Sequence, residues 1–482
     1  MTGRAGRTSP GTVLVAWLCS DIVSLFGTSL SSLAVPWMVL TLTHNAAVTG
    51  MVSAIQLGML VLANLLSGPI IDALGPTRIS VACDTISACF IALIPLLWLV
   101  HRFSIPALIV IVAVAGAMRG PSNSAKSTLS PRVASYARQP MERITGLSGT
   151  TDRLAATVGS AVGGIIVGAV GGAYALAFTS LGLILGASLI GLIVRPALLA
   201  DCAQSPQGNG TDSPRTAATD TAARSTAGTA ADTMAQEPEA GRAPEATRNR
   251  AEDHGHGPGT SRRNGASRYC RDLVAGWKAL KALPVVLALT LIPSVTNMID
   301  VAWSDVLTPA WVMAQHHSSQ SLGLLFAAFS LPALAASIAA TALATKLPRF
   351  PVLVIGYLVA GAPRYIAMAL NAPIPVLLIV LAVGGLGMGF LNPIIGAVVY
   401  ERIPDETRGR VVSLMGAIAW GLMPLGSLLG GLGTHLIGLN LTLGISGALY
   451  LGVTMLPLFI PSWRDIGRPQ SGSLPTHEHH AA

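Results

Sequence analysis

The sequence predicts an all-α membrane protein with twelve transmembrane helices in two pseudo-symmetric six-helix bundles. Charged residues are 11% of the 482 residues and hydrophobic residues 51%, whereas about a quarter of a soluble domain is charged. Apolar runs of about 18 residues or more, long enough to cross a bilayer, occur in two groups of six. One polar stretch, residues 201–268, separates the two groups.

The N-terminal block, residues 1–200, is divided by Gly, Pro, His and charged residues. These breaks place helices near 13–42, 48–71, 79–100, 105–129, 154–171 and 173–195. Arg4 and Arg7 precede the first run, but no small-residue cleavage site follows a short apolar core. We therefore interpret this run as a retained helix rather than a signal peptide.

Residues 201–268 are rich in Ala, Thr, Gly, Pro and charge. Because they have little apolar surface to offset the entropy of ordering, we predict a disordered linker. The block 269–463 begins with an amphipathic segment, Tyr269 to Leu283. Its helices are expected near 284–313, 320–346, 351–370, 374–400, 411–435 and 438–461, and a polar tail, 464–482, follows.

Lys and Arg in the short loops predict the orientation in the membrane. With the N-terminus in the cytoplasm, the outer loops hold only Arg102, and the inner loops hold Arg78, Arg132, Arg138, Arg143, Lys346, Arg349, Arg402, Arg408 and Arg410. We expect a multi-pass protein of the cell membrane with both termini and the linker in the cytoplasm. The segment with Lys278 and Lys281 on one side and Trp277 and Leu280 on the other is expected to lie on the anionic inner leaflet.

The net charge of +8 does not indicate nucleic acid binding, because the basic residues lie in loops and the linker rather than on a face with stacking aromatics. No two of the five cysteines have metal-ligand spacing. A nucleophile elbow, a phosphate-binding glycine loop and a His–Glu metal motif are also lacking. We therefore expect neither an enzyme nor a bound metal or cofactor.

Ionisable residues inside apolar runs are the informative candidates, because burying them in a bilayer is costly. Asp21 lies about eight residues into the first helix, roughly 12 Å deep, and Arg119 is similarly deep in the fourth. The two are expected either to form a functional pair in a water-filled cleft or to be a permanent ion pair that fixes packing. Asp84 and Lys126 lie nearer the cytoplasmic side, where contact with lipid headgroups or anchoring of a loop is expected.

In the second half, Asn297 and Asp300 share one face of the seventh helix, and Arg364 is the basic residue that matches Arg119. Asp305 lies near the outer end, where it is expected either to be solvated or to act in the pathway. Aromatic side chains are expected to line the cleft or, equally well, to face lipid; they are Trp37, Trp303, Phe326, Phe329 and Trp420.

Glycine stripes occur on the fifth and eleventh helices. They comprise Gly159, Gly163 and Gly164 in one half, and Gly426 and Gly430 in the other. Small residues let helix backbones approach closely, which serves static packing as well as sliding contacts. Because comparable stripes occur in both halves, a moving interface is favoured.

The loop after the second expected helix carries a recognisable motif. Gly68, Asp72 and Gly75 match G-x-L-x-D-R-x-G-R-R/K, the cytoplasmic loop motif of the major facilitator superfamily, although two of its arginines are replaced and the surviving one, Arg78, is displaced. The chain therefore resembles that family.

Further stretches resemble the branch of this family that contains enterobactin-type siderophore exporters and macrolide or multidrug efflux proteins. They are residues 35–40, 125–131 and 401–410, together with 159–164, which is similar to the antiporter motif G-P-x-x-G-G. The resemblance implies a cytoplasmic gate made by the loop motif together with Glu401, Arg402, Arg408, Gly409 and Arg410.

The resemblance implies a carrier whose two bundles rock about a cleft. We expect proton-coupled export of an amphipathic small molecule, drug-like or siderophore-like, with Asp21 or Asp300 as the proton site. The expected partners are lipid, substrate and proton, and the expected state is a monomer. Two alternatives stay open: a nutrient importer or uniporter of the same fold, and a transport-dead sensor or scaffold that acts through the linker.

Overall fold

The computed structural model describes residues 9–204, 274–343 and 348–459. Within these ranges the chain is helical, without a strand, and twelve segments are long and apolar enough to cross a membrane. The predicted fold class and number of spanning helices are therefore confirmed for this part of the chain. Most of the predicted linker, residues 205–268, and the predicted tail, 464–482, lie outside it.

The N-terminal half contains six spans joined by short loops. Ser9 caps the first helix by accepting a hydrogen bond from the amide of Thr12, and Asn45 caps the second in the same way. The helices are α1 (Pro10–Thr43), α2 (Ala46–Leu74), α3 (Pro76–Leu99), α4 (Ile105–Ala137), α5 (Met141–Val170) and α6 (Gly172–Leu189), and the last continues through the π-helix η1 (Ile190–Val194) into α7 (Arg195–Gln204).

The C-terminal half begins with a short helix over 274–281, in which Leu280 is buried and Trp277 is exposed beneath Lys281. Three of the six spans that follow are interrupted. In chain order the elements are α10 (Pro284–Ala302), η2 (Trp303–Leu307) and α11 (Thr308–Ala314) as one span, α12 (Ser319–Leu343), α13 (Arg349–Ala360) with α14 (Ala362–Ala369), α15 (Ile374–Arg402), α16 (Asp405–Gly421) with α17 (Met423–Ile437), and α18 (Leu439–Phe459).

One helix start and two helix breaks differ from the boundaries predicted from the sequence. α5 begins at Met141, well before the expected 154, because its first turns are polar and hydropathy does not detect them. The ninth span breaks at Gly361, where the ring of Tyr450 occupies the place that a Cβ would take. The eleventh breaks at Leu422, ahead of a proline in the first turn of α17, which has no N–H to continue the preceding helix.

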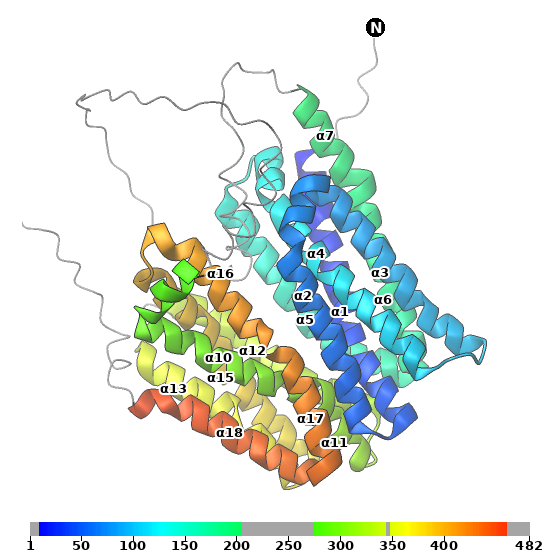
Figure 1. Cartoon of the computed structure of the whole chain (residues 1–482), viewed down its shortest axis with the longest axis vertical. Coiled ribbons are helices and arrows are strands. Elements are labelled where there is room, and N and C mark those ends of the chain that lie inside the picture. The colour runs from blue at the N-terminus through cyan, green and yellow to red at the C-terminus, as the bar shows by residue number, and fades with distance from the viewer. Residues whose placement is uncertain (1–8, 205–273, 344–347, 460–482) are drawn as a thin grey trace, which may run out of the picture.

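The spans run between two opposite faces of the molecule. One face, here called the terminal face, holds the start of α1, the end of α7, the start of α10 and the end of α18. The other, here called the loop face, holds the connections at residues 43–46, 170–172, 314–319 and 437–439. Figure 1 shows the two halves close together around α11 and α17 and diverging toward α7 and α16.

The most extensive contacts between the halves are made by two helix pairs, α2 with α17 and α5 with α12, and α1 and α2 also pack against η2. A Cβ added at Gly50 would clash with the carbonyl oxygen of Ser427, and one added at Gly164 would clash with the Cα of Gly323. These contacts lie in the loop-face parts of the four helices. The two halves are therefore closed against each other at the loop face.

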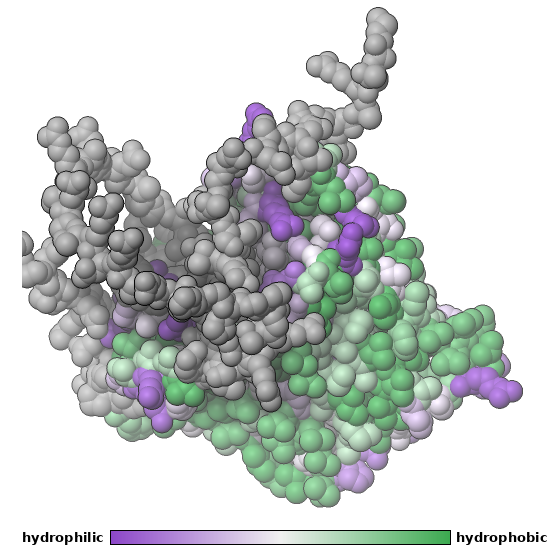
Figure 2. Space-filling model, turned by 45° about the horizontal axis from the view of Figure 1, so that its top comes forward, coloured by the Kyte–Doolittle hydropathy of each residue, from purple (hydrophilic) through white to green (hydrophobic). Residues whose placement is uncertain are grey.

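The flanks of the molecule are apolar, as a bilayer requires. Large side chains such as Leu192, Ile379 and Leu436 are 65–78% exposed. Figure 2 shows hydrophobic residues covering much of the visible flank, with hydrophilic residues concentrated near its ends. The polar groups inside the spans therefore need partners within the protein, and these partners define the candidate site.

Candidate functional site

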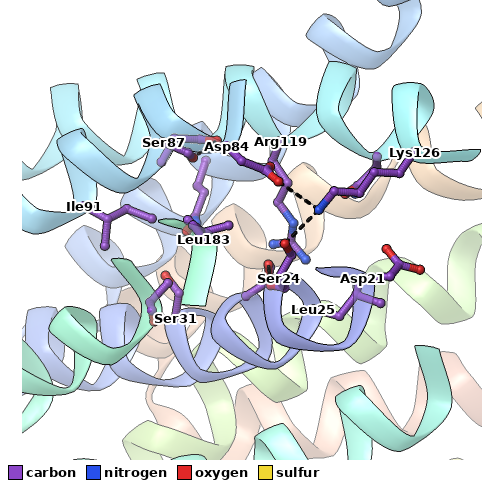
Figure 3. Close-up of a pocket in the computed structure, with 15 residues that line it drawn as sticks. Asp21, Ser24, Leu25, Ser31, Asp84, Ser87, Ile91, Arg119, Lys126 and Leu183 are labelled. Atoms are coloured by element: carbon purple, nitrogen blue, oxygen red, sulfur yellow. Dashed lines mark hydrogen bonds and ion pairs between the residues drawn. The ribbon is translucent and has the colours of Figure 1, made fainter. Parts of the chain in front are cut away.

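A cavity in the N-terminal half is lined by charged and polar side chains of the spanning helices (Figure 3). The helices α1, α2, α3, α4 and α6 contribute to it. Its apolar wall comes from residues such as Leu25, Ile91 and Leu183, and its charged residues are Asp21, Asp84, Arg119 and Lys126. The cavity therefore combines apolar and polar walls, the two kinds of surface that an amphipathic molecule also presents.

Lys126 and Asp84 form the ion pair at the centre of this cavity. The Lys126 Nζ lies 2.9 Å from an oxygen of Asp84, and both side chains are 5% exposed. Lys126 also donates to the hydroxyl of Ser24 over 2.7 Å, and the Ser122 hydroxyl donates to Asp84. The pair and its bond to Ser24 connect α1, α3 and α4, which corrects the sequence-based expectation that these two residues contact headgroups or anchor a loop.

Asp21 lies on α1 one turn before Ser24, at the edge of the same cluster. Its expected pairing with Arg119 is not formed: no ion pair involves either residue in the described part of the chain, and the carboxylate of Asp21 points away from Arg119 in Figure 3. The Arg119 Nε is buried without a hydrogen-bond partner. A permanent Asp21–Arg119 pair therefore does not hold this conformation together.

The structure brings Asp300 and Arg364 together in the C-terminal half as an ion pair between α10 and α14. The Tyr365 hydroxyl donates to Asp300 over 3.2 Å. The Arg364 guanidinium is enclosed by four aromatic rings at 4.6–5.8 Å, from Trp303, Phe329, Tyr365 and Tyr450. Cation–π contacts of this kind stabilise a desolvated guanidinium, so Arg364 is held by the rings as well as by Asp300.

The remaining cleft candidates are separated in space. Trp303 is 3% exposed and packs within the C-terminal half, so it does not line an open cleft, whereas Trp420 is 50% exposed. Trp37 is partly buried against the largest apolar cluster. Asn297 donates to the carbonyl oxygen of Ala419 over 3.3 Å and thereby ties α10 to α16.

The gate candidates lie at the terminal face. Asp72 and Arg78 are exposed on either side of Gly75, which has φ +85° and links α2 to α3, and Gly68 lies on α2 with open space beside it. In the other half, Glu401 makes two hydrogen bonds with Arg349 at 2.5 and 2.8 Å. The other gate candidates of this half lie on α15 and α16 and are Arg402, Arg408, Gly409 and Arg410.

The glycine stripes serve two kinds of contact. A Cβ at Gly159 would lie 2.7 Å from Ser29 on α1, and Gly163 faces Leu30 of the same helix. Gly426 and Gly430 face α10 within their own half. Gly164 lies at the contact between the two halves, where it faces Gly323. Gly431 also lies at a contact between the halves, and a Cβ there would lie 2.5 Å from the carbonyl oxygen of Ala46.

Sequence reasoning missed the partners that hold these charges. Ser24 and Ser122 carry no signal that separates them from the other serines of the apolar runs. Tyr365, adjacent to Arg364 in the chain, and Tyr450 were also not identified. An aromatic next to an intramembrane arginine was the available signal for Tyr365, because arginine stacks on aromatic faces.

Comparison with known proteins gives relatives along the whole chain. The family description Major Facilitator Superfamily matches residues 17–302 and 290–479. The multidrug efflux pump Tap of Mycobacterium tuberculosis is 25% identical over 452 residues, 93% of each chain. The pump of the same name from Mycolicibacterium fortuitum is 22% identical over 443 residues, 91% of this chain and 93% of the relative.

Solved structures with the same architecture include a D-xylose–proton symporter, with a TM-score of 0.61 and 13% identity over 93% of this chain and 98% of the other. A POT family transporter in complex with a thioalcohol-conjugated peptide has a TM-score of 0.60 and 10% identity over 92% of this chain and 95% of the other. At these identities the likeness concerns the fold alone. Because the family description covers most of the chain in both halves, the protein belongs to the Major Facilitator Superfamily and is a multi-pass membrane transporter.

Proposed function

We propose that this transporter exports amphipathic small molecules from the cytoplasm in exchange for protons. The similarity to multidrug efflux pumps supports export, and the mixed apolar and polar wall of the cavity suits an amphipathic substrate. In this proposal the terminal face is cytoplasmic, in agreement with the basic residues of its loops. The conformation is then closed to the outside.

The observation that carries the proposal is the isolation of Asp21. Asp84 is held by Lys126 and Ser122, and Asp300 is held by Arg364 and Tyr365. Asp21 is the cavity carboxylate without an ion-pair partner among the described residues. A carboxylate whose charge is not neutralised by a fixed cation can gain or lose a proton without breaking a buried ion pair.

Substrate and proton are then linked through the cavity. A substrate that enters from the cytoplasm displaces the proton of Asp21, and a proton from outside restores it after the substrate has left. The charge state of Asp21 shifts the balance between the two conformations by the difference in its interactions in each. Closure of the terminal face would bring the Asp72 loop toward the end of α15 and the start of α16, where Glu401, Arg402, Arg408 and Arg410 lie.

Proton release on substrate binding tests this proposal. A thermal-stabilisation screen of amphipathic compounds first identifies a ligand, with the dye ethidium as a starting probe. Adding that ligand to detergent-purified protein in weak buffer should release protons. Asp21→Asn should still bind the ligand, because the amide keeps the shape of the side chain, but should release none.

The matched control is His101→Gln, which changes a titratable residue in the exposed loop between α3 and α4 and should release protons as the wild type does. Equal release from Asp21→Asn and wild type would overturn the assignment of Asp21. Proton-driven uptake of the ligand into inverted vesicles checks the direction of transport. A transporter that imports its substrate into the cytoplasm would show no such uptake.

A further inference from the structure

Asp305 is a half-buried carboxylate that does not line the cavity. It lies in η2, the π-helical turn between α10 and α11. One carboxylate oxygen accepts from the hydroxyl of Ser304 at 3.0 Å, and the other accepts from the hydroxyl of Ser427 on α17, also at 3.0 Å. Both partners are neutral, and no ion pair involves Asp305 within the described ranges.

The position of Ser427 places this carboxylate at the contact between the two halves. Ser427 is fully buried, and its carbonyl oxygen fills the space beside Gly50 of α2. One turn later a Cβ at Gly431 would lie 3.0 Å from the Cα of Gly50. We call this α2–α17 contact, together with η2, the loop-face seam. Opening of the loop face must separate this seam and increase the exposure of Asp305 to water.

Among the residues that the structure describes, none forms an ion pair with Asp305. The elements packed against η2 are α1, α2, α10, α11 and α17. On α11 there is no titratable residue, and on the others, including the C-cap of α1, the titratable residues are Cys19, Asp21, His44, Asp72, Asp300 and His435. The two histidines lie at the helix ends of the loop face and Asp300 is engaged by Arg364.

We propose that Asp305 is a second proton-binding site, which carries a proton while the loop-face seam is closed and releases it when the seam opens. An ionised carboxylate that is half-buried between two neutral partners is less favourable than the neutral acid, which keeps acceptor oxygens for the serine hydroxyls. Proton binding from the loop-face compartment therefore favours closure. This site deepens the proton-coupled export proposed above and rests on it for its role in the transport cycle.

The sign of the pH dependence follows from this assignment. The closed seam binds one more proton than the open seam, so the ratio of open to closed molecules rises with pH. The limiting slope is about tenfold per pH unit, the value for the exchange of one proton. Protonation of Asp305 after substrate release would close the loop face and return the transporter to the conformation described here.

The test measures the seam directly. Spin labels at Leu42 on α1 and Leu436 on α17, which are 40% and 74% exposed at the loop-face ends of the two halves, report the opening by distance distributions in lipid nanodiscs. The five native cysteines are first replaced by alanine or serine. All measurements use an Asp21→Asn background without ligand, so that proton binding in the cavity does not contribute.

In that background the open population should grow as the pH rises from about 5 to about 9. Adding Asp305→Asn, which keeps the size and hydrogen-bonding capacity of the side chain, should hold the closed population constant over the same range. The absence of a pH response in the Asp21→Asn background, or a response that persists with Asp305→Asn, would overturn the proposal.

Ser427→Ala gives a second line of evidence if Asp305→Asn does not fold. It keeps the carboxyl but removes one donor to its charged form, so the midpoint of the response should move to higher pH. An unshifted midpoint would contradict the assignment. The spin-label distances are measured without transport, so the two proposals can fail separately. If wild type releases no protons on ligand binding, the proposed coupling at Asp21 is refuted, but the pH response of the loop-face seam is still expected.

Discussion

The Lys126–Asp84 pair allows a quantitative prediction about the stability of the N-terminal half. Lys126→Met keeps a long apolar side chain but removes the cation that lies 2.9 Å from Asp84. Asp84 then retains the hydroxyl of Ser122 as its hydrogen-bond donor. Because the carboxylate is 5% exposed, it is stranded without charge compensation. Removing one partner of a buried pair typically costs about 3–5 kcal/mol, and we expect a loss in this range.

The second mutation determines whether the loss comes from the stranded charge. Asp84→Asn removes the carboxylate and keeps an oxygen that accepts from Ser122. We expect the double variant Lys126→Met/Asp84→Asn to be more stable than Lys126→Met alone, because no charge remains unpaired. The coupling free energy between two residues in one network is typically about 0.5–3 kcal/mol. Unfolding in mixed detergent micelles, followed by tryptophan fluorescence, measures all variants.

An exposed ion pair of the same protein is the control. Glu401 pairs with Arg349 at the terminal face, with side-chain exposures of 52% and 28%. Exposed pairs contribute about 0.2–1 kcal/mol in double-mutant cycles, so Glu401→Gln should change the unfolding free energy far less than Lys126→Met. Equal losses in the two variants, or strictly additive effects in the Lys126/Asp84 cycle, would refute this reasoning.

Two further predictions concern the two faces of the molecule. Gly164→Ala should prevent closure of the loop face, because the new Cβ clashes with Gly323, and distance measurements across that face should show a larger open population; Gly146→Ala on the same helix meets no atom within 4 Å and should leave the distances unchanged. Asp72→Asn should leave the unfolding free energy unchanged because Asp72 is exposed, but should keep the terminal face open for longer. Faster labelling of a cysteine at Thr77 would show this effect, and an unchanged rate would rule it out.

The sequence was sufficient for the number and approximate positions of the spanning helices because each span needs about 20 predominantly apolar residues to cross a bilayer. It was insufficient where tertiary contacts decide the local geometry. The break at Gly361 exists because the ring of Tyr450, far away in the chain, occupies the adjacent space. The polar first turns of α5 have no hydropathy signal, and they are helical in the structure.

The candidate site was predictable residue by residue but not pair by pair. Asp21, Arg119, Asp300 and Arg364 were each identifiable as charges inside apolar runs. Pairing depends on the rotation of each helix about its axis and on which helices are neighbours, and neither quantity is encoded in the apolar pattern. Depth alone therefore suggested Arg119 as the partner of Asp21, whereas the ion pair in the cavity is formed by Lys126 and Asp84.

The two halves differ in how their intramembrane carboxylates are paired, and this difference bears on which half responds to protons. In the C-terminal half Arg364 is enclosed by aromatic rings and its carboxylate partner is also held by a tyrosine, so a change of charge there would strand a buried guanidinium. In the N-terminal cavity neither Asp21 nor Arg119 forms an ion pair with a described residue. A proton can be exchanged at Asp21 without dismantling a fixed pair, so the N-terminal half is where we expect substrate binding and proton binding to be linked.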